Sequence, residues 1–165
     1  MFQHNFFQSS LQTEQCNLLA ARGDLEKLKP IKGWNETTCG EAAKWGRLEI
    51  LKFLRSQKCP WDSTTCSHAA LRGHMDVLIW ARDNGCPWDS TTCSSAAWGG
   101  HLDILKYLKT QNCPWDSATT TRAAMNGCLP TFKWAHENGC PVDTDKCLKT
   151  QNIHIKNYFR KIGLK

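Results

Sequence analysis

The chain has 165 residues, of which 41% are hydrophobic and 22% charged, a composition typical of a folded soluble domain rather than a disordered chain. No run of about 18 apolar residues is present, so no membrane-spanning helix is expected. The net charge of +6 lies in the last 20 residues, because residues 1–145 hold 15 basic and 15 acidic side chains. This distribution disfavours a uniformly basic body that binds nucleic acid.

The sequence repeats itself every 27 residues. The tetrapeptide Cys-Pro-Trp-Asp begins at Cys59, Cys86 and Cys113, and a variant, Cys-Pro-Val-Asp, begins at Cys140. Residues 59–85 and 86–112 are identical at 15 of 27 positions. Such a period is typical of a solenoid, in which each unit buries its apolar face against its neighbours. We predict one repeat domain over 1–165, with an N-terminal cap at 1–31, full units at 32–58, 59–85, 86–112 and 113–139, and a C-terminal cap at 140–165.

Each unit is predicted to form two antiparallel helices. In residues 59–85, Asp62 can cap a first helix over 63–71, and Gly73 ends that helix. A second helix is predicted over 75–83, followed by Gly85 as a left-handed stop. The apolar face expected for this second helix is formed by Met75, Leu78 and Ile79, with Val77 and Trp80 beside them. The predicted fold class is therefore all-α, a right-handed stack of about six helix pairs.

Small side chains recur in the first helix of every unit. The Ala-Ala pairs at 42–43, 69–70, 96–97 and 123–124 allow close approach between neighbouring helices, and Cys39, Cys66 and Cys93 are expected to pack as small apolar groups. Because no Cys-x-x-Cys occurs, we predict no metal site. Ten cysteines behind an N-terminus without secretory features favour free thiols and a cytoplasmic location, with the nucleus as the alternative.

One tryptophan recurs in each linker, at Trp34, Trp61, Trp88 and Trp115. Aromatic side chains in register can stack on the bases of single-stranded RNA. They can equally seal the ends of the helices. The aspartates that follow the last three tryptophans, at 62, 89 and 116, would repel phosphates, so we favour the packing role.

Catalytic signatures are missing from the sequence. It contains no glycine-rich phosphate loop, no His-Glu-x-x-His and no Gly-x-Ser-x-Gly. His74 and His101 fall in turns between helices, and His68 and His136 have no recurring partner. We therefore predict that the chain is not an enzyme, with no catalytic residues, no cofactor and no small-molecule substrate.

The repeated unit resembles the ankyrin repeat. Thr64-Thr65-Cys66-Ser67 occupies the place of Thr-Pro-Leu-His in that family, residues 69–74 are similar to its Ala-Ala-x-x-Gly-His, and residues 75–78 are similar to its Leu-Glu-Ile-Val. The resemblance covers roughly residues 15–145. The family period is 33, and the six residues missing here correspond to the β-hairpin, so hairpins are expected to be absent or vestigial. The Cys-Pro-Trp-Asp linker is similar to the shortened repeats of algae, oomycetes and large DNA viruses.

The resemblance implies a non-enzymatic scaffold that binds an as yet unknown protein partner. Where equivalent positions of the repeats carry different residues, the fold does not require a particular side chain. Several of these variable positions, at the end of the first helix, carry large or basic side chains. The residues predicted to bind the partner are Trp45, Leu71, Arg72, Trp98, Arg122 and Met125. The alternative that these side chains only pad neighbouring units stays open.

The basic C-terminal segment is predicted to be a capping helix over 153–164. Its apolar side would comprise Ile155, Tyr158, Phe159 and Ile162, opposite Lys156 and Lys161. The alternatives are an acidic partner, an anionic membrane surface or nuclear targeting. With the tryptophan ladder, this tail also defines the second candidate function, a nucleic-acid-binding module. We expect a monomer.

Overall fold

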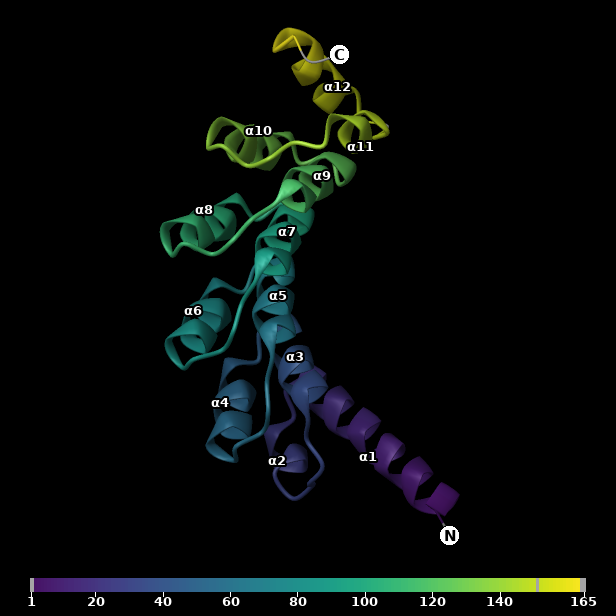
Figure 1. Ribbon diagram of the computed structural model, residues 1–165. Coiled ribbons are helices and arrows are strands. Elements are labelled where there is room, and N and C mark those ends of the chain that lie inside the picture. Colours follow the sequence, from purple (N-terminus) through teal and green to yellow (C-terminus); the bar gives the residue numbers. More distant parts are fainter. Residues whose placement is uncertain (1, 151, 164–165) are drawn as a thin grey trace. The chain divides into compact units, whose positions relative to one another are not determined.

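The computed structural model describes residues 2–150 and 152–163, and within that part of the chain every regular element is a helix (Figure 1). The helices are α1 (Phe2–Arg22), α2 (Leu25–Leu28), α3 (Glu36–Lys44), α4 (Leu48–Ser56), α5 (Ser63–Arg72), α6 (Met75–Asp83), α7 (Ser90–Gly99), α8 (Leu102–Thr110), α9 (Ser117–Met125), α10 (Leu129–Glu137), α11 (Thr144–Leu148) and α12 (Ile153–Lys161). The all-α prediction is confirmed. None of the described helices combines the length and apolar character that a bilayer span requires.

The chain forms two compact units, Met1–Pro87 and Trp88–Lys165. In the first unit α3 packs against α1 and α5, and α4 and α6 each lie against the helix that precedes them. In the second unit α7 packs against α9, and α8 and α10 each lie against the helix that precedes them. One helix pair therefore falls within each 27-residue frame between residues 32 and 139.

Each first helix begins at a polar cap that ends the linker. The side chains of Asp62, Asp89 and Asp116 accept hydrogen bonds from the backbone amides two residues further on, at 2.8–2.9 Å. Asn35 takes the same role at the start of α3 and bonds two amides. An N-cap of this kind stabilises a helix by about 1 kcal/mol, because it satisfies an amide that has no partner within the helix. The capping role predicted for Asp62 is confirmed.

The predicted glycine stops are also confirmed. Gly73 ends α5 with a φ of 82°, and Gly85 follows α6 with a φ of 84°. In two other frames the position of Gly85 is held by Lys58, with a φ of 62°, and by Asn112, with a φ of 55°. The turn therefore requires a left-handed backbone even where the sequence offers no glycine, and such residues are strained relative to glycine.

The core consists of small side chains on the first helices and larger ones on the second. All four Ala-Ala pairs have no exposed surface, and Leu51, Leu78 and Leu105 are equally buried. The apolar face predicted for α6 was partly wrong. Val77, Leu78 and Ala81 form the buried stripe, whereas Met75 is half-buried and Ile79 is 36% exposed. The cause is helical periodicity, because Ile79 lies about 200° around the axis from Val77, on the solvent side.

The linker tryptophans pack edge-on against aromatic residues of the second helices. Ring centres are 5.5 Å apart for Trp34 and Phe53, 6.0 Å for Trp61 and Trp80, and 6.0 Å for Trp115 and Trp134. Basic side chains cover two of these rings, since Arg55 lies 4.1 Å above Trp61 and Lys109 lies 4.0 Å above Trp115. The packing role is confirmed for Trp34, Trp61 and Trp115.

The C-terminal helix closes the core of the second unit. Ile155 and Phe159 are fully buried beside Phe132 and Cys147, with the Phe132 and Phe159 ring centres 5.4 Å apart. The capping prediction is confirmed for these two residues. Ile162 was placed on the wrong side, because the helix ends at Lys161 and leaves Ile162 37% exposed. The last predicted position, 164, lies outside the described residues.

Candidate protein-interaction surface

The six residues proposed for partner binding lie at or just beyond the C-terminal ends of three first helices and on α9. We call Trp45, Leu71, Arg72, Trp98, Arg122 and Met125 the first-helix edge. Trp45, Trp98 and Met125 are among the large apolar side chains that solvent reaches, with 46%, 38% and 58% of their surfaces exposed. Arg72 and Arg122 are exposed, but Leu71 is half-buried and offers less contact area than expected.

In the first unit the edge is organised around Trp45. The Trp45 indole Nε1 donates to Oε2 of Glu41 at 3.1 Å, and Lys44 Nζ donates to the other oxygen at 2.9 Å. The Arg72 guanidinium lies 5.5 Å from the Trp45 ring centre. Glu41 therefore fixes the orientation of the indole and neutralises one neighbouring cation, and the structure brings Trp45 and Arg72 together.

In the second unit the edge is formed by Trp98, Arg122 and Met125. The Arg122 guanidinium lies 5.9 Å from the Trp98 ring centre. Asn126 Nδ2 donates to the Trp98 carbonyl oxygen at 2.6 Å and ties the end of α7 to α9. The three edge residues therefore share one surface that combines aromatic, basic and flexible apolar character.

Two hollows open beside this part of the edge. One, of about 380 Å³, lies between α7 and α9, and the other, of about 390 Å³, lies between α9 and α11. Both are lined by Thr121, Met125 and Lys146, and the first also by Trp98 and Arg122. The edge is thus bordered by concave features of the size that accommodates a side chain.

Lys146 and Lys149 belong to this surface, and sequence reasoning missed them by treating them only as part of the basic tail. Lys149 lines the hollow beside α11, and Lys146 lines both hollows. The signal was available, because Lys149 stands 27 residues after Arg122 in the repeat frame. Lys146 Nζ forms an ion pair with Asp143 at 2.7 Å, which raises the pKa of Lys146 and lowers the pKa of Asp143.

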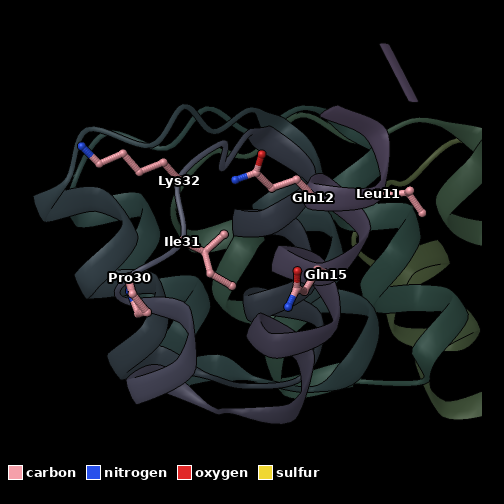
Figure 2. Close-up of a pocket in the computed structure, with 6 residues that line it drawn as sticks. All are labelled: Leu11, Gln12, Gln15, Pro30, Ile31 and Lys32. Atoms are coloured by element: carbon pink, nitrogen blue, oxygen red, sulfur yellow. The ribbon is translucent and has the colours of Figure 1, made fainter. Parts of the chain in front are cut away.

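A larger hollow, of about 710 Å³, lies beside α1 in the first unit (Figure 2). Its lining comes from α1 and from the segment after α2, and consists of Leu11, Gln12, Gln15, Pro30, Ile31 and Lys32. The side chains of this lining include no carboxylate, thiol, hydroxyl or imidazole. It contains none of the six residues of the first-helix edge.

Nine of the ten cysteines are buried, among them Cys39, Cys66 and Cys93 as predicted, whereas Cys128 is half-buried. All ten are free thiols. The linker cysteines have a role that the sequence did not reveal. The thiols of Cys59, Cys86, Cys113 and Cys140 each donate to the carbonyl oxygen of the N-cap residue 24 positions earlier, at 3.3–3.5 Å. A thiol suits this place because it packs as a small apolar group and still donates to a carbonyl.

One pair of thiols lies closer than the repeat spacing suggests. The Cys39 and Cys59 sulfur atoms are 3.5 Å apart, because the helix cysteine meets the linker cysteine that follows it 20 residues later. The S–H contact with Cys59 and burial together raise the pKa of Cys39. Within the described residues, no group of three or more His, Cys, Asp or Glu side chains could hold a metal ion.

Three of the histidines have structural partners. His68 Nδ1 lies 3.2 Å from the Gly40 carbonyl oxygen, and His136 Nδ1 lies 3.1 Å from the Tyr158 hydroxyl. The His74 ring packs against Gly46, where an added Cβ would come within 2.7 Å of it. Each of these histidines therefore links an element to a neighbour, which is a packing role.

Comparison with known proteins identifies the architecture. No protein-family model and no curated protein matches the sequence. Among solved structures, the ankyrin repeat domain of human ASB11 is similar, with a TM-score of 0.69 at 16% sequence identity, over 91% of this chain and 84% of that one. Sequence identity this low supports the fold alone. The chain therefore has the fold of an ankyrin repeat domain, as the repeat pattern predicted.

Proposed function

We propose that this chain is a non-enzymatic scaffold that binds another protein through its first-helix edge. The observation that carries the proposal is the exposure of Trp45, Trp98 and Met125 at positions where the repeat frame imposes no fixed residue. Aromatic, methionine and arginine side chains are those enriched at the centres of protein interfaces. The ankyrin fold supports the proposal, because folds of this kind typically act as non-enzymatic interaction scaffolds.

The mechanism would be rigid display. The edge side chains stand on helices whose Ala-Ala pairs are completely buried, so their backbones are held by the core. Trp45 is further held by Glu41, and Trp98 lies beside Arg122. A surface that is ordered before docking loses little conformational entropy when a partner binds.

The packing of the linker tryptophans supports this function over nucleic-acid binding. A base-stacking ladder needs open aromatic faces, whereas Arg55 and Lys109 cover Trp61 and Trp115, and both rings pack against the second helices. Salt-dependent quenching of tryptophan fluorescence by homopolymeric RNA would support the alternative. We also propose a reducing location such as the cytoplasm, in keeping with ten free thiols.

The test is the substitution Trp98→Ala in the full chain. We expect chemical crosslinking in cell extract to lose the partner bands that the unchanged protein captures. Trp98 keeps 38% of its surface exposed, and its contact with Arg122 contributes only about 0.5–1 kcal/mol. Trp98→Ala should therefore cost less than the roughly 3–5 kcal/mol of a buried tryptophan, and Tm should fall by less than about 10 °C. A larger fall in Tm would mean that Trp98 belongs to the core.

A matched control is available on a second helix. Ile79 is 36% exposed, close to the 38% of Trp98, but it belongs to the second helix α6 and is not one of the six edge residues. Ile79→Ala should leave capture unchanged. Equal loss of capture in Trp98→Ala and Ile79→Ala would contradict a binding site on the edge.

A further inference from the structure

The second unit carries a surface whose chemistry points to a definite class of partner. We define the α9–α11 surface as Trp98, Arg122, Met125, Lys146 and Lys149. These residues line the two hollows of about 380 and 390 Å³, and the hollows adjoin because Thr121, Met125 and Lys146 line both. The surface is therefore continuous and concave on either side of Met125.

The charge of the α9–α11 surface is positive. Its lining holds three cationic side chains and no carboxylate. Lys146 is paired with Asp143, which is not among the lining residues. Within the described part of the chain, no carboxylate forms an ion pair with Arg122 or Lys149. The nearby Asp143 carboxylate, whose pKa Lys149 helps to lower, is already paired with Lys146, so Arg122 and Lys149 can still meet an external anion.

The same surface is apolar between its charges. Met125 is 58% exposed and forms a wall of both hollows, and Trp98 borders the first hollow. A methionine side chain is flexible and polarizable, so it adapts to apolar groups of different shape. The hollows are accordingly suited to an apolar side chain rather than to a second charge.

From this combination we infer that the α9–α11 surface binds an acidic segment of a partner protein that carries an apolar side chain. The inference rests on the proposed function and specifies the partner. Carboxylates of the segment would meet Arg122 and Lys149, and the apolar side chain would enter a hollow beside Met125. A nucleic acid fits less well, because Arg122 lies over the Trp98 ring and the hollows offer apolar walls without an open aromatic face.

The test uses the full chain and synthetic peptides. The probe is a fluorescent peptide of ten Asp and Glu residues with one central Leu, and its binding is measured by anisotropy at low and at physiological ionic strength. We expect saturable binding that weakens with salt. Replacing the Leu by Ser should weaken binding several-fold, and a peptide of Lys with one Leu should not bind.

The double variant Arg122→Gln, Lys149→Gln should weaken peptide binding about tenfold, because it removes both cations that would bind carboxylates of the peptide. The matched control is Lys106→Gln with Arg160→Gln, which removes the same charge from exposed positions on α8 and α12. The control should bind as the unchanged protein does. If both double variants weaken peptide binding equally, the loss of net charge alone explains the weakening, and the inference is overturned.

Two further outcomes separate this inference from the proposed function. If the peptide fails to bind while Trp98→Ala still abolishes partner capture, the acidic class of partner is wrong and the scaffold function stands. If an RNA homopolymer binds and the peptide does not, and Arg122→Gln with Lys149→Gln removes the RNA binding, the surface takes nucleic acid and the inference fails.

Discussion

Cys140 should make the folded chain lose stability in alkaline solution. Its sulfur is buried and donates to the Asp116 carbonyl oxygen at 3.3 Å. Burial raises the pKa of Cys140 from the ordinary thiol value of 9.0 to about 12, because a thiolate would lose its hydration there. The folded state therefore favours the neutral thiol, and ionisation of Cys140 favours unfolding.

The sign and size of the effect follow from the two pKa values. The stabilisation is fully present below pH 9 and is lost as the pH rises from 9 toward 12, at up to 1.36 kcal/mol per pH unit. Without screening, this single group would lower the free energy of unfolding by about 1.4 kcal/mol at pH 10 and about 2.7 kcal/mol at pH 11. Because the linker borders solvent and water screens part of the penalty, we expect about 1 and about 2 kcal/mol.

The assay compares the unchanged protein with Cys140→Ser by urea unfolding at pH 7.5, 10 and 11 under reducing conditions. Serine keeps a donor for the Asp116 carbonyl oxygen but does not ionise in this range. The other ionisable groups are the same in both proteins, so their contribution cancels in the difference. The variant should lose less stability than the unchanged protein on going to pH 11. If the free energy of unfolding falls equally in the two proteins between pH 7.5 and 11, the argument that Cys140 resists ionisation in the folded state is refuted.

The remaining predictions concern backbone strain and thiol access. Lys58→Gly should raise the free energy of unfolding by about 0.5–1 kcal/mol, because Lys58 is exposed and holds a φ of 62°. Asn112→Gly should gain less, since asparagine tolerates the left-handed region, and a fall in Tm for Lys58→Gly in thermal unfolding would contradict the argument. Cys128 is the one cysteine that is not fully buried, so a disulfide reagent should modify one thiol rapidly and nine slowly. Cys128→Ser should remove the rapid phase, and a rapid phase that persists would place the accessible thiol elsewhere.

Local features of the fold could be predicted from the sequence because they depend on neighbouring residues. The cap at Asp62 and the stops at Gly73 and Gly85 follow from backbone chemistry within one unit. The burial of the Ala-Ala pairs was expected because these residues are both small and recurrent, which suits the contact between neighbouring repeats. These features required no knowledge of distances in space.

Features that depend on packing geometry could not be predicted in this way. The exposure of Ile79 was missed because an apolar residue beside an apolar stripe has no signature of its own. The bonds from the linker thiols to the N-cap carbonyls join residues 24 apart, a spacing that is not a multiple of the period. The approach of Cys39 to Cys59, 20 residues apart, escaped for the same reason, because comparison of units relates equivalent positions only.

The repeat frame also explains why the choice of partner can be set in one part of the chain. At the position of Arg122 the other 27-residue repeats carry Glu41, His68, Ser95 and Lys149, so the fold requires neither a charge nor a particular size there. In the first unit the Glu41 carboxylate accepts hydrogen bonds from Trp45 and Lys44, so its charge is neutralised within the protein. In the second unit Arg122 and Lys149 lie on a concave surface without a carboxylate in its lining. At this repeat position, which the core does not constrain, the charged side chain of the first unit is paired within the protein. The two cations at the same position in the second unit form no ion pair within the described residues and can bind an external acidic group.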